Sequence, residues 1–184
     1  PAGNDFESYK KFLLDQNIDI SGISIRKDVA TSSYFVITDK DDNQIGSFYL
    51  GASKYAKNLS VVSKKIKPDF VILAPAEPEA MKKYVSQCRK YKLPYIYDPA
   101  FQIGAFSADD LLNGIRGAKI LIGNDYEISL IEKKLKTNHS ELLKLCPVVI
   151  TTLGGKGSII EIAGRKMFIP SAKPKKVVDP TGAG

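Results

Sequence analysis

Short apolar runs alternate with amphipathic stretches from residue 69 onward. The apolar runs predict buried strands at 70–73, 95–97, 119–122 and 148–151. Between them, helical spacing of apolar residues predicts helices at 78–91, 107–114, 124–136 and 140–145. Alternating strands and helices are typical of a mostly parallel sheet covered by helices on both faces. Two further strands, 158–162 and 166–169, are expected to form an antiparallel pair around a turn.

The pattern before residue 50 is different. A helix is predicted from Phe6 to about Asn17, with Asp5 as its N-cap. β-Branched and aromatic residues then predict three short strands at 23–26, 33–38 and 44–50. Because so small an antiparallel sheet has no core of its own, we expect residues 20–50 to form a lid.

The predicted fold class is therefore α/β: a three-layer α/β/α core with a mostly parallel sheet, and a small antiparallel β lid. The core is assigned to residues 1–19 and 51–184, and the lid to residues 20–50. Four lid aromatics alternate along the strands: Tyr34, Phe35, Phe48 and Tyr49. One face could cover a ring-bearing ligand, whereas packing between the strands is the simpler interpretation.

Composition narrows the class of protein. The chain has 184 residues, 43% of them hydrophobic and 26% charged, as in an ordinary globular domain. No apolar run is long enough to cross a bilayer and no secretory-signal pattern is present, so we expect a cytoplasmic protein without a membrane partner. Cys88 and Cys146 lie apart from any zinc-ligand spacing and are expected to be buried small hydrophobes.

The net charge of +7 admits an anionic partner. The lysines are dispersed over separate elements, however, and no basic block is interleaved with aromatic residues. We therefore expect no nucleic-acid partner and favour a small anionic molecule, with a basic nucleic-acid-binding module kept as a weak alternative.

Polar residues and glycines follow four predicted strands directly. They are Asp98, Asn124, Thr152 and Gly182. Because the carboxyl ends of parallel strands meet at one edge of the sheet, these four positions should lie along that edge, where such folds bind ligands.

The segment Asn124–Glu127 begins a predicted helix and has two interpretations. Asn at the N-cap with Glu three residues later is a capping pattern that stabilises a helix by about 1 kcal/mol without any function. The alternative places Glu127 near a phosphate-bound magnesium ion, directly or through water. Taken alone, the segment favours capping.

The loop 151–157, Thr-Thr-Leu-Gly-Gly-Lys-Gly, joins two strands. It fits a hairpin loop with glycines at positive φ, or a backbone cradle for a nucleotide with Thr152 donating its hydroxyl. Neither a Walker loop nor a G-x-G-x-x-G fingerprint occurs in the chain, which argues against a dinucleotide-binding oxidoreductase. The one histidine, His139, lies in a predicted polar loop and gives a Ser–His hydrolase little support.

The segment Val178–Gly184 is the barest stretch of backbone. Main-chain N–H groups of Gly182, Ala183 and Gly184 could converge on an anion, because no large side chain blocks them. A strand ending in a glycine turn is the simpler alternative on spacing alone.

Together these motifs resemble the ribokinase-like (PfkB) family of carbohydrate and nucleoside kinases. Gly3–Phe6 resembles the family's G-x-D segment and Ile18–Ile23 the entry to its lid. Asn124–Glu127 matches N-x-x-E, Thr152–Gly157 matches T-L-G-x-x-G, and Asp179–Gly184 matches D-x-T-G-A-G-D up to its last residue. The resemblance covers essentially the whole chain.

The resemblance implies an ATP-dependent phosphotransferase whose acceptor is a hydroxyl group of a sugar or nucleoside. It implies that Thr152, Gly154 and Gly157 hold the nucleotide, and that Asn124 and Glu127 place phosphate and Mg²⁺. Asp179 and Thr181 would shape the last loop, which could hold a monovalent cation. Gly182, Ala183 and Gly184 would form an anion hole for the transferring phosphoryl group.

Two departures from the family pattern matter. The aspartate that acts as the family's general base would stand just beyond Gly184, and the N-terminal glycine motif with the acid that grips substrate hydroxyls is missing. We therefore expect a central fragment of a longer enzyme that is inactive alone. Residues 44–52 and Asp98-Pro99 are similar to the adenosine-kinase-like branch, which favours an adenosine- or ribose-like acceptor.

Relatives often pair through such lids, which predicts a homodimer. An alternative is a catalytically inactive ligand-binding or regulatory protein with the same fold.

Overall fold

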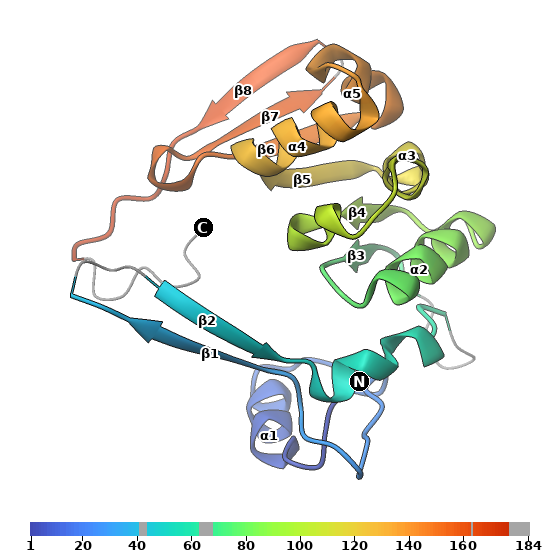
Figure 1. Cartoon of the computed structure of the whole chain (residues 1–184), viewed down its shortest axis with the longest axis vertical. Coiled ribbons are helices and arrows are strands. Elements are labelled where there is room, and N and C mark those ends of the chain that lie inside the picture. The colour runs from blue at the N-terminus through green and yellow to red at the C-terminus, as the bar shows by residue number, and fades with distance from the viewer. Residues whose placement is uncertain (41–43, 63–67, 163, 177–184) are drawn as a thin grey trace. The chain divides into compact units, whose positions relative to one another are not determined.

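The computed structural model describes residues 1–40, 44–62, 68–162 and 164–176. Contacts within the chain separate it into two compact units, Pro1–Ile66 (unit 1) and Lys67–Gly184 (unit 2). Both are drawn in Figure 1. The assignment of residues 1–19 and 51–184 to a core and 20–50 to a lid stays a prediction.

Unit 2 is built on a six-stranded sheet in the order β3-β4-β5-β6-β7-β8. Its strands are β3 Val71–Leu73, β4 Tyr95–Tyr97, β5 Ile120–Asn124, β6 Val148–Thr152, β7 Ser158–Ile162 and β8 Arg165–Ile169. The first four run parallel to one another, and β7 and β8 add antiparallel strands at one edge. The mostly parallel sheet and its terminal antiparallel pair are thus as predicted.

The α-helices of unit 2 form a single layer within the described residues. They are α2 Pro78–Lys90, α3 Ala108–Gly117, α4 Asp125–Leu135 and α5 His139–Leu145. Helix α3 contacts α2, α4 and α5, so the four helices lie on the same face of the sheet. Three short 3₁₀ turns, η2 Ala100–Gly104, η3 Gly154–Lys156 and, in unit 1, η1 Gly51–Asn58, had no counterpart among the predicted elements.

The two faces of the sheet in unit 2 differ in burial. Beneath the helices, Tyr95, Leu121 and Val149 are fully buried. The intervening residues point to the opposite face and remain partly exposed, most clearly Ile72, which is 67% exposed. Alternation of this kind follows from the two-residue period of a strand. The core of unit 2 therefore lies between the sheet and the helical layer.

Both cysteines belong to that core. Cys88 and Cys146 are free and fully buried, as the sequence predicted. Burial raises the pKa of the Cys88 thiol to about 11, so the group stays protonated and behaves as a small apolar side chain.

Among the described residues, no helix has the length and apolar character that a membrane crossing needs.

Unit 1 contains helix α1 Glu7–Asp15, strands β1 Ser33–Thr38 and β2 Gln44–Tyr49, and η1. β1 and β2 pair antiparallel as a two-stranded hairpin. The prediction of a strand at 23–26 is wrong. Within the described residues, Ile25 makes only an isolated parallel bridge with Ala2. The backbone of this segment pairs with the chain's first residues instead of with β1 or β2. The Arg26 N–H donates to the Ala2 carbonyl, and the Ala2 N–H donates to the Ser24 carbonyl.

The predicted N-cap of α1 is also wrong. The helix begins after Phe6, which offers no side-chain cap, and the Asp5 carboxylate is used elsewhere. Asp5 Oδ1 accepts hydrogen bonds from the backbone N–H of Thr31 at 2.7 Å and from its hydroxyl at 2.6 Å. These bonds lower the pKa of the Asp5 carboxyl, and they join two segments that are far apart in the sequence.

Candidate functional site

A cavity of about 430 Å³ opens where β4, β5 and β6 end. Asp98 follows β4, Asn124 closes β5, and Thr152 closes β6. Asn124 and Thr152 stand opposite each other in the register of the two parallel strands. The predicted common edge is therefore confirmed for these three residues, whereas Gly182 lies outside the described residues.

Asn124 and Glu127 cap helix α4 reciprocally. The Asn124 side-chain oxygen accepts a hydrogen bond from the Glu127 backbone N–H at 2.8 Å. Glu127 Oε2 accepts one from the Asn124 backbone N–H, also at 2.8 Å. The capping interpretation is thus confirmed. It leaves Glu127 Oε1 without a hydrogen bond to any described residue and available to a ligand.

Gly123 gives Glu127 the room to fold back over the start of its helix. A Cβ at this glycine would lie 3.3 Å from both Cβ and Oε2 of Glu127, tighter than ordinary contact. A larger residue at position 123 would therefore press on the capping carboxylate. The absence of a side chain at the end of β5 and the capping of α4 by Glu127 therefore depend on each other.

Asp98 is the most perturbed acid of this cavity. Burial raises the pKa of its carboxyl, the neighbouring Glu127 carboxylate raises it further, and a backbone hydrogen bond from Ala100 opposes both. The Glu127 carboxylate thus disfavours the charged form of Asp98, and a bound cation would relieve that cost.

These donors fit a magnesium ion that keeps part of its hydration. Within the described chain, no three His, Cys, Asp or Glu side chains lie close enough to form a metal cluster. Magnesium in phosphate-transfer sites is commonly held by one or two carboxylates together with substrate phosphates and water. Glu127 and Asp98 supply such carboxylates, and the phosphates of a ligand together with water would complete the coordination of Mg²⁺.

The glycine loop between β6 and β7 has the conformation of a hairpin with positive φ. Gly154 has φ 57° and Gly157 φ 108°. Thr152 and Gly154 line the cavity, but Gly157 does not. A Cβ at Gly157 would meet the backbone of residues 169–171, so this glycine permits a close approach of two chain segments. The structure therefore brings together Asn124, Glu127, Thr152 and Gly154.

The remaining predicted site residues are not described. Asp179, Thr181, Gly182, Ala183 and Gly184 lie outside the described residues, and with them the proposed anion hole and cation loop.

Two lining residues received no role from the sequence. Asp125 and Tyr126 form the first turn of α4 and also line the cavity, with the Tyr126 side chain 72% exposed. The available signal was their position inside the N-x-x-E segment, because residues in the first turn of a helix after a strand face the sheet edge. Asp98 was predicted to lie at this edge but was assigned no binding role.

A second capping box in unit 2 provides an internal comparison. Asn138 and Glu141 repeat the Asn-x-x-Glu spacing at the start of α5, with Asn138 Oδ1 accepting from the Glu141 N–H at 3.1 Å. Glu141 Oε2 also accepts a hydrogen bond from the Thr137 hydroxyl. This box is absent from the lining of the strand-end cavity. The capping pattern alone therefore does not mark a site.

His139 holds elements of the fold together, which agrees with the weak support for a hydrolase. It begins α5, where its Nδ1 lies 3.0 Å from Glu132 Oε1 of α4 and its Nε2 is hydrogen-bonded to Glu161 Oε2 of β7. The imidazole thus ties two helices to a strand.

In unit 1, the segment that resembles G-x-D packs on residues 30–31. The Gly3 backbone N–H donates to the Thr31 hydroxyl at 2.9 Å, and a Cβ at Gly3 would collide with the backbone between Ala30 and Thr31. A separate cavity of about 250 Å³ adjoins this segment and is lined by Gly3, Asn4, Phe6 and Ile23, among others.

The fold and the cavity define a class of protein: an α/β protein with a ligand site at the carboxyl ends of parallel strands. A capped helix start and a glycine loop flank that site, as expected for a phosphate-bearing ligand. More specifically, the chain belongs to the pfkB family of carbohydrate kinases, whose family model matches residues 1–184.

Three relatives illustrate the similarity. The nucleoside kinase of Methanothermobacter thermautotrophicus is 34% identical over 187 residues, and that of Methanocaldococcus jannaschii is 32% identical over 185. The solved structure of the Methanocaldococcus jannaschii protein covers 99% of this chain with a TM-score of 0.90. The Burkholderia thailandensis nucleoside kinase in complex with inosine has a TM-score of 0.92 at 24% identity and shows the shared fold.

The chain is shorter than these relatives. It matches in full, yet it spans 60% of the length of both archaeal nucleoside kinases and 61% of the Burkholderia chain.

Proposed function

We propose that this chain is part of an ATP-dependent phosphotransferase that phosphorylates a hydroxyl group of a nucleoside or sugar. One observation carries the proposal: Asn124, Glu127, Thr152 and Gly154, each named from a separate motif position, line a single cavity at the carboxyl ends of the strands. Membership of the pfkB family supports it.

A nucleoside is the favoured acceptor. Both archaeal relatives are described as nucleoside kinases at 32% and 34% identity, and the Burkholderia structure holds inosine. An adenosine- or ribose-like acceptor agrees with these names. Free sugars remain the competing acceptors in the assay below.

Each residue has a role in the proposed transfer. The Thr152 hydroxyl and the Gly154 backbone hold the nucleotide, and Asn124 and Glu127 position its phosphates. Glu127 would hold Mg²⁺, which would supply positive charge that offsets the charge of the phosphates. The anion hole is assigned to the backbone N–H groups of Gly182, Ala183 and Gly184.

The chemical step is an in-line displacement. The aspartate expected directly after Gly184 takes the proton of the acceptor hydroxyl, and the oxygen forms a bond to the γ-phosphorus of ATP. The bond from that phosphorus to the bridging oxygen breaks, and ADP leaves. The lid is assigned the exclusion of water, which otherwise competes as acceptor.

The assay uses the full-length protein with MgATP and a panel of nucleosides and pentose or hexose sugars. ADP release and ³¹P NMR of the product are measured for each acceptor. Phosphorylation of at least one nucleoside is expected, with a higher kcat/KM than for any free sugar. ATP binding without transfer to any acceptor would support the inactive ligand-binding alternative and overturn the kinase.

A homodimer through the hairpin is the proposed assembly. Phe35, Ile37 and Ile45 share one face of the β1–β2 hairpin and are 64%, 78% and 80% exposed. Apolar residues gathered on one exposed face are typical of a protein interface.

The test exploits strand alternation. Ile37→Lys with Ile45→Lys should give a monomer by size-exclusion chromatography with light scattering. Lysines at Thr38 and Gln44, the next pair in the register but on the opposite face, should leave the dimer intact. A monomeric parent protein, or equal effects of both pairs, would contradict this assembly.

A further inference from the structure

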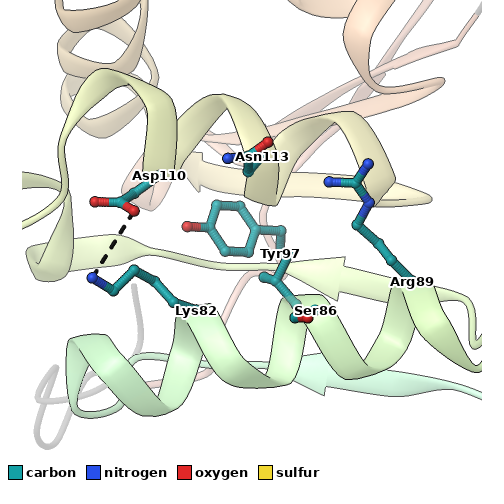
Figure 2. A pocket seen from close by; sticks show the side chains of 7 residues that line it. Lys82, Ser86, Arg89, Tyr97, Asp110 and Asn113 are labelled. Atoms are coloured by element: carbon teal, nitrogen blue, oxygen red, sulfur yellow. Dashed lines mark ion pairs between the residues drawn. The ribbon is translucent and has the colours of Figure 1, made fainter.

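A second cavity lies in the helical layer of unit 2, apart from the strand ends. It measures about 310 Å³ and is formed between α2 and α3. Figure 2 shows α2 contributing Lys82, Ser86 and Arg89, and α3 contributing Asp110 and Asn113. It shares no lining residue with the strand-end cavity.

The floor of this cavity carries a hydroxyl group that faces the cavity and has no protein partner among the described residues. Tyr97 of β4 is 1% exposed, and its hydroxyl makes no hydrogen bond within the described residues. No fully enclosed side-chain oxygen or nitrogen of those residues lacks a partner, so solvent must reach the Tyr97 hydroxyl through the cavity. A hydroxyl in that position is free to bond to water or to the polar group of a ligand that enters the cavity.

The sequence keeps the Tyr97 ring in place. A Cβ at Gly114 of α3 would meet the ring and hydroxyl of Tyr97, so only glycine allows the helix to approach this closely. Burial raises the pKa of the Tyr97 hydroxyl, which therefore stays protonated and can donate a hydrogen bond. In Figure 2 the ring lies between the two helices with its hydroxyl toward Lys82 and Asp110.

The charges around the cavity are unequally satisfied. Lys82 is paired with Glu79 and lies 4.0 Å from Asp110, whose Oδ2 is already bonded to Ser107. Arg89 makes no ion pair with any described residue. Its guanidinium lies at the opposite end from the Lys82–Asp110 pair, on the side of Asn113 (Figure 2).

We propose that this cavity binds a small organic anion that carries hydroxyl groups, of the sugar-phosphate or sugar-acid type. The phosphate or carboxylate pairs with the Arg89 guanidinium, whose fork of donors matches both groups. The hydroxyls of the ligand bond with the Tyr97 hydroxyl, the Asn113 amide and the Asp110 carboxylate. The volume suits a ligand of this size. The proposal does not depend on the kinase activity.

The test measures direct binding to the full-length protein by isothermal titration calorimetry. The probes are ribose 5-phosphate, gluconate and, as the neutral counterpart, ribose. Binding of one or both anions at millimolar concentration or below, with ribose much weaker, is expected. The two anions distinguish a phosphate from a carboxylate ligand.

Variants locate the bound probe. Arg89→Gln should raise the Kd about tenfold to a hundredfold, since it removes a charge-assisted pair. Tyr97→Phe keeps the ring and should raise the Kd about threefold to tenfold. Lys90→Gln makes the same charge change one residue along α2, outside the cavity lining, and should change the Kd less than about twofold.

Glu127→Gln tests whether the probe binds at the strand-end cavity instead. This substitution should leave the Kd of the probe unchanged. Three results would overturn the proposal: no binding of either anion, equal losses in Arg89→Gln and Lys90→Gln, or affinity lost in Glu127→Gln but kept in Tyr97→Phe. Because no turnover is measured, failure here and failure of the kinase proposal are separate observations.

Discussion

Replacing Glu127 with glutamine separates its capping role from its proposed role at magnesium. The amide oxygen of Gln can still accept the hydrogen bond from the Asn124 backbone N–H, which measures 2.8 Å to Glu127 Oε2. The change removes only the negative charge and the free carboxylate oxygen. A purely structural Glu127 would therefore tolerate the substitution well.

The two roles predict effects of different size. Loss of a negative charge from the first turn of α4 should lower the free energy of unfolding by about 0.3–1 kcal/mol. For a domain of this size that corresponds to at most about 4 °C in Tm. Loss of a magnesium-positioning group should instead reduce kcat about 10–100-fold and raise the Mg²⁺ concentration needed for half-maximal rate.

The matched control is Glu141→Gln in the second capping box. It changes the same residue type at the same spacing from an Asn cap, away from the strand-end cavity. ADP release is followed for both variants over a range of Mg²⁺ concentrations, alongside thermal unfolding. Normal magnesium dependence in Glu127→Gln, or equal activity losses in the two variants, would refute the argument for a metal role.

Three further outcomes are expected. Gly157→Ala should lower the free energy of unfolding by about 1–3 kcal/mol in urea titrations, because alanine is strained at φ 108° and its methyl would meet the Ile169 carbonyl oxygen; unchanged stability would contradict that packing. Since the folded-state pKa of Asp98 is raised from 3.8, its contribution to stability falls as pH rises above that value, so Asp98→Asn should stabilise the protein at neutral pH and lose this advantage below 3.8. A gain that persists in acid would show another cause. Gly182→Val should abolish turnover while thermal unfolding stays normal, and normal turnover would exclude the anion-hole role of Gly182.

Local sequence patterns were sufficient to predict those helices, strands and caps that are determined by their own residues. The capping box at Asn124 follows from residue spacing alone, and it forms as predicted. The common edge of Asp98, Asn124 and Thr152 follows from the rule that parallel strands point the same way.

Contacts between distant segments were beyond such reasoning. Asp5 looked like an N-cap, but its carboxylate bonds to Thr31, 26 residues away, and no local pattern reports that competition. The segment 23–26 has strand-forming residues, yet only tertiary pairing decides whether a strand joins a sheet. Likewise, the open hydroxyl of Tyr97 depends on how closely α3 approaches β4 at Gly114.

A single peptide bond connects the strand-end cavity with the cavity between α2 and α3, because Asp98 lines the first and Tyr97 the second. Thermodynamic reciprocity then constrains both ligands. If an occupant between the helices alters nucleotide affinity by some factor, the nucleotide must alter that occupant's affinity by the identical factor. Under such coupling, how tightly an occupant is held between the helices would report how far the strand-end cavity is filled.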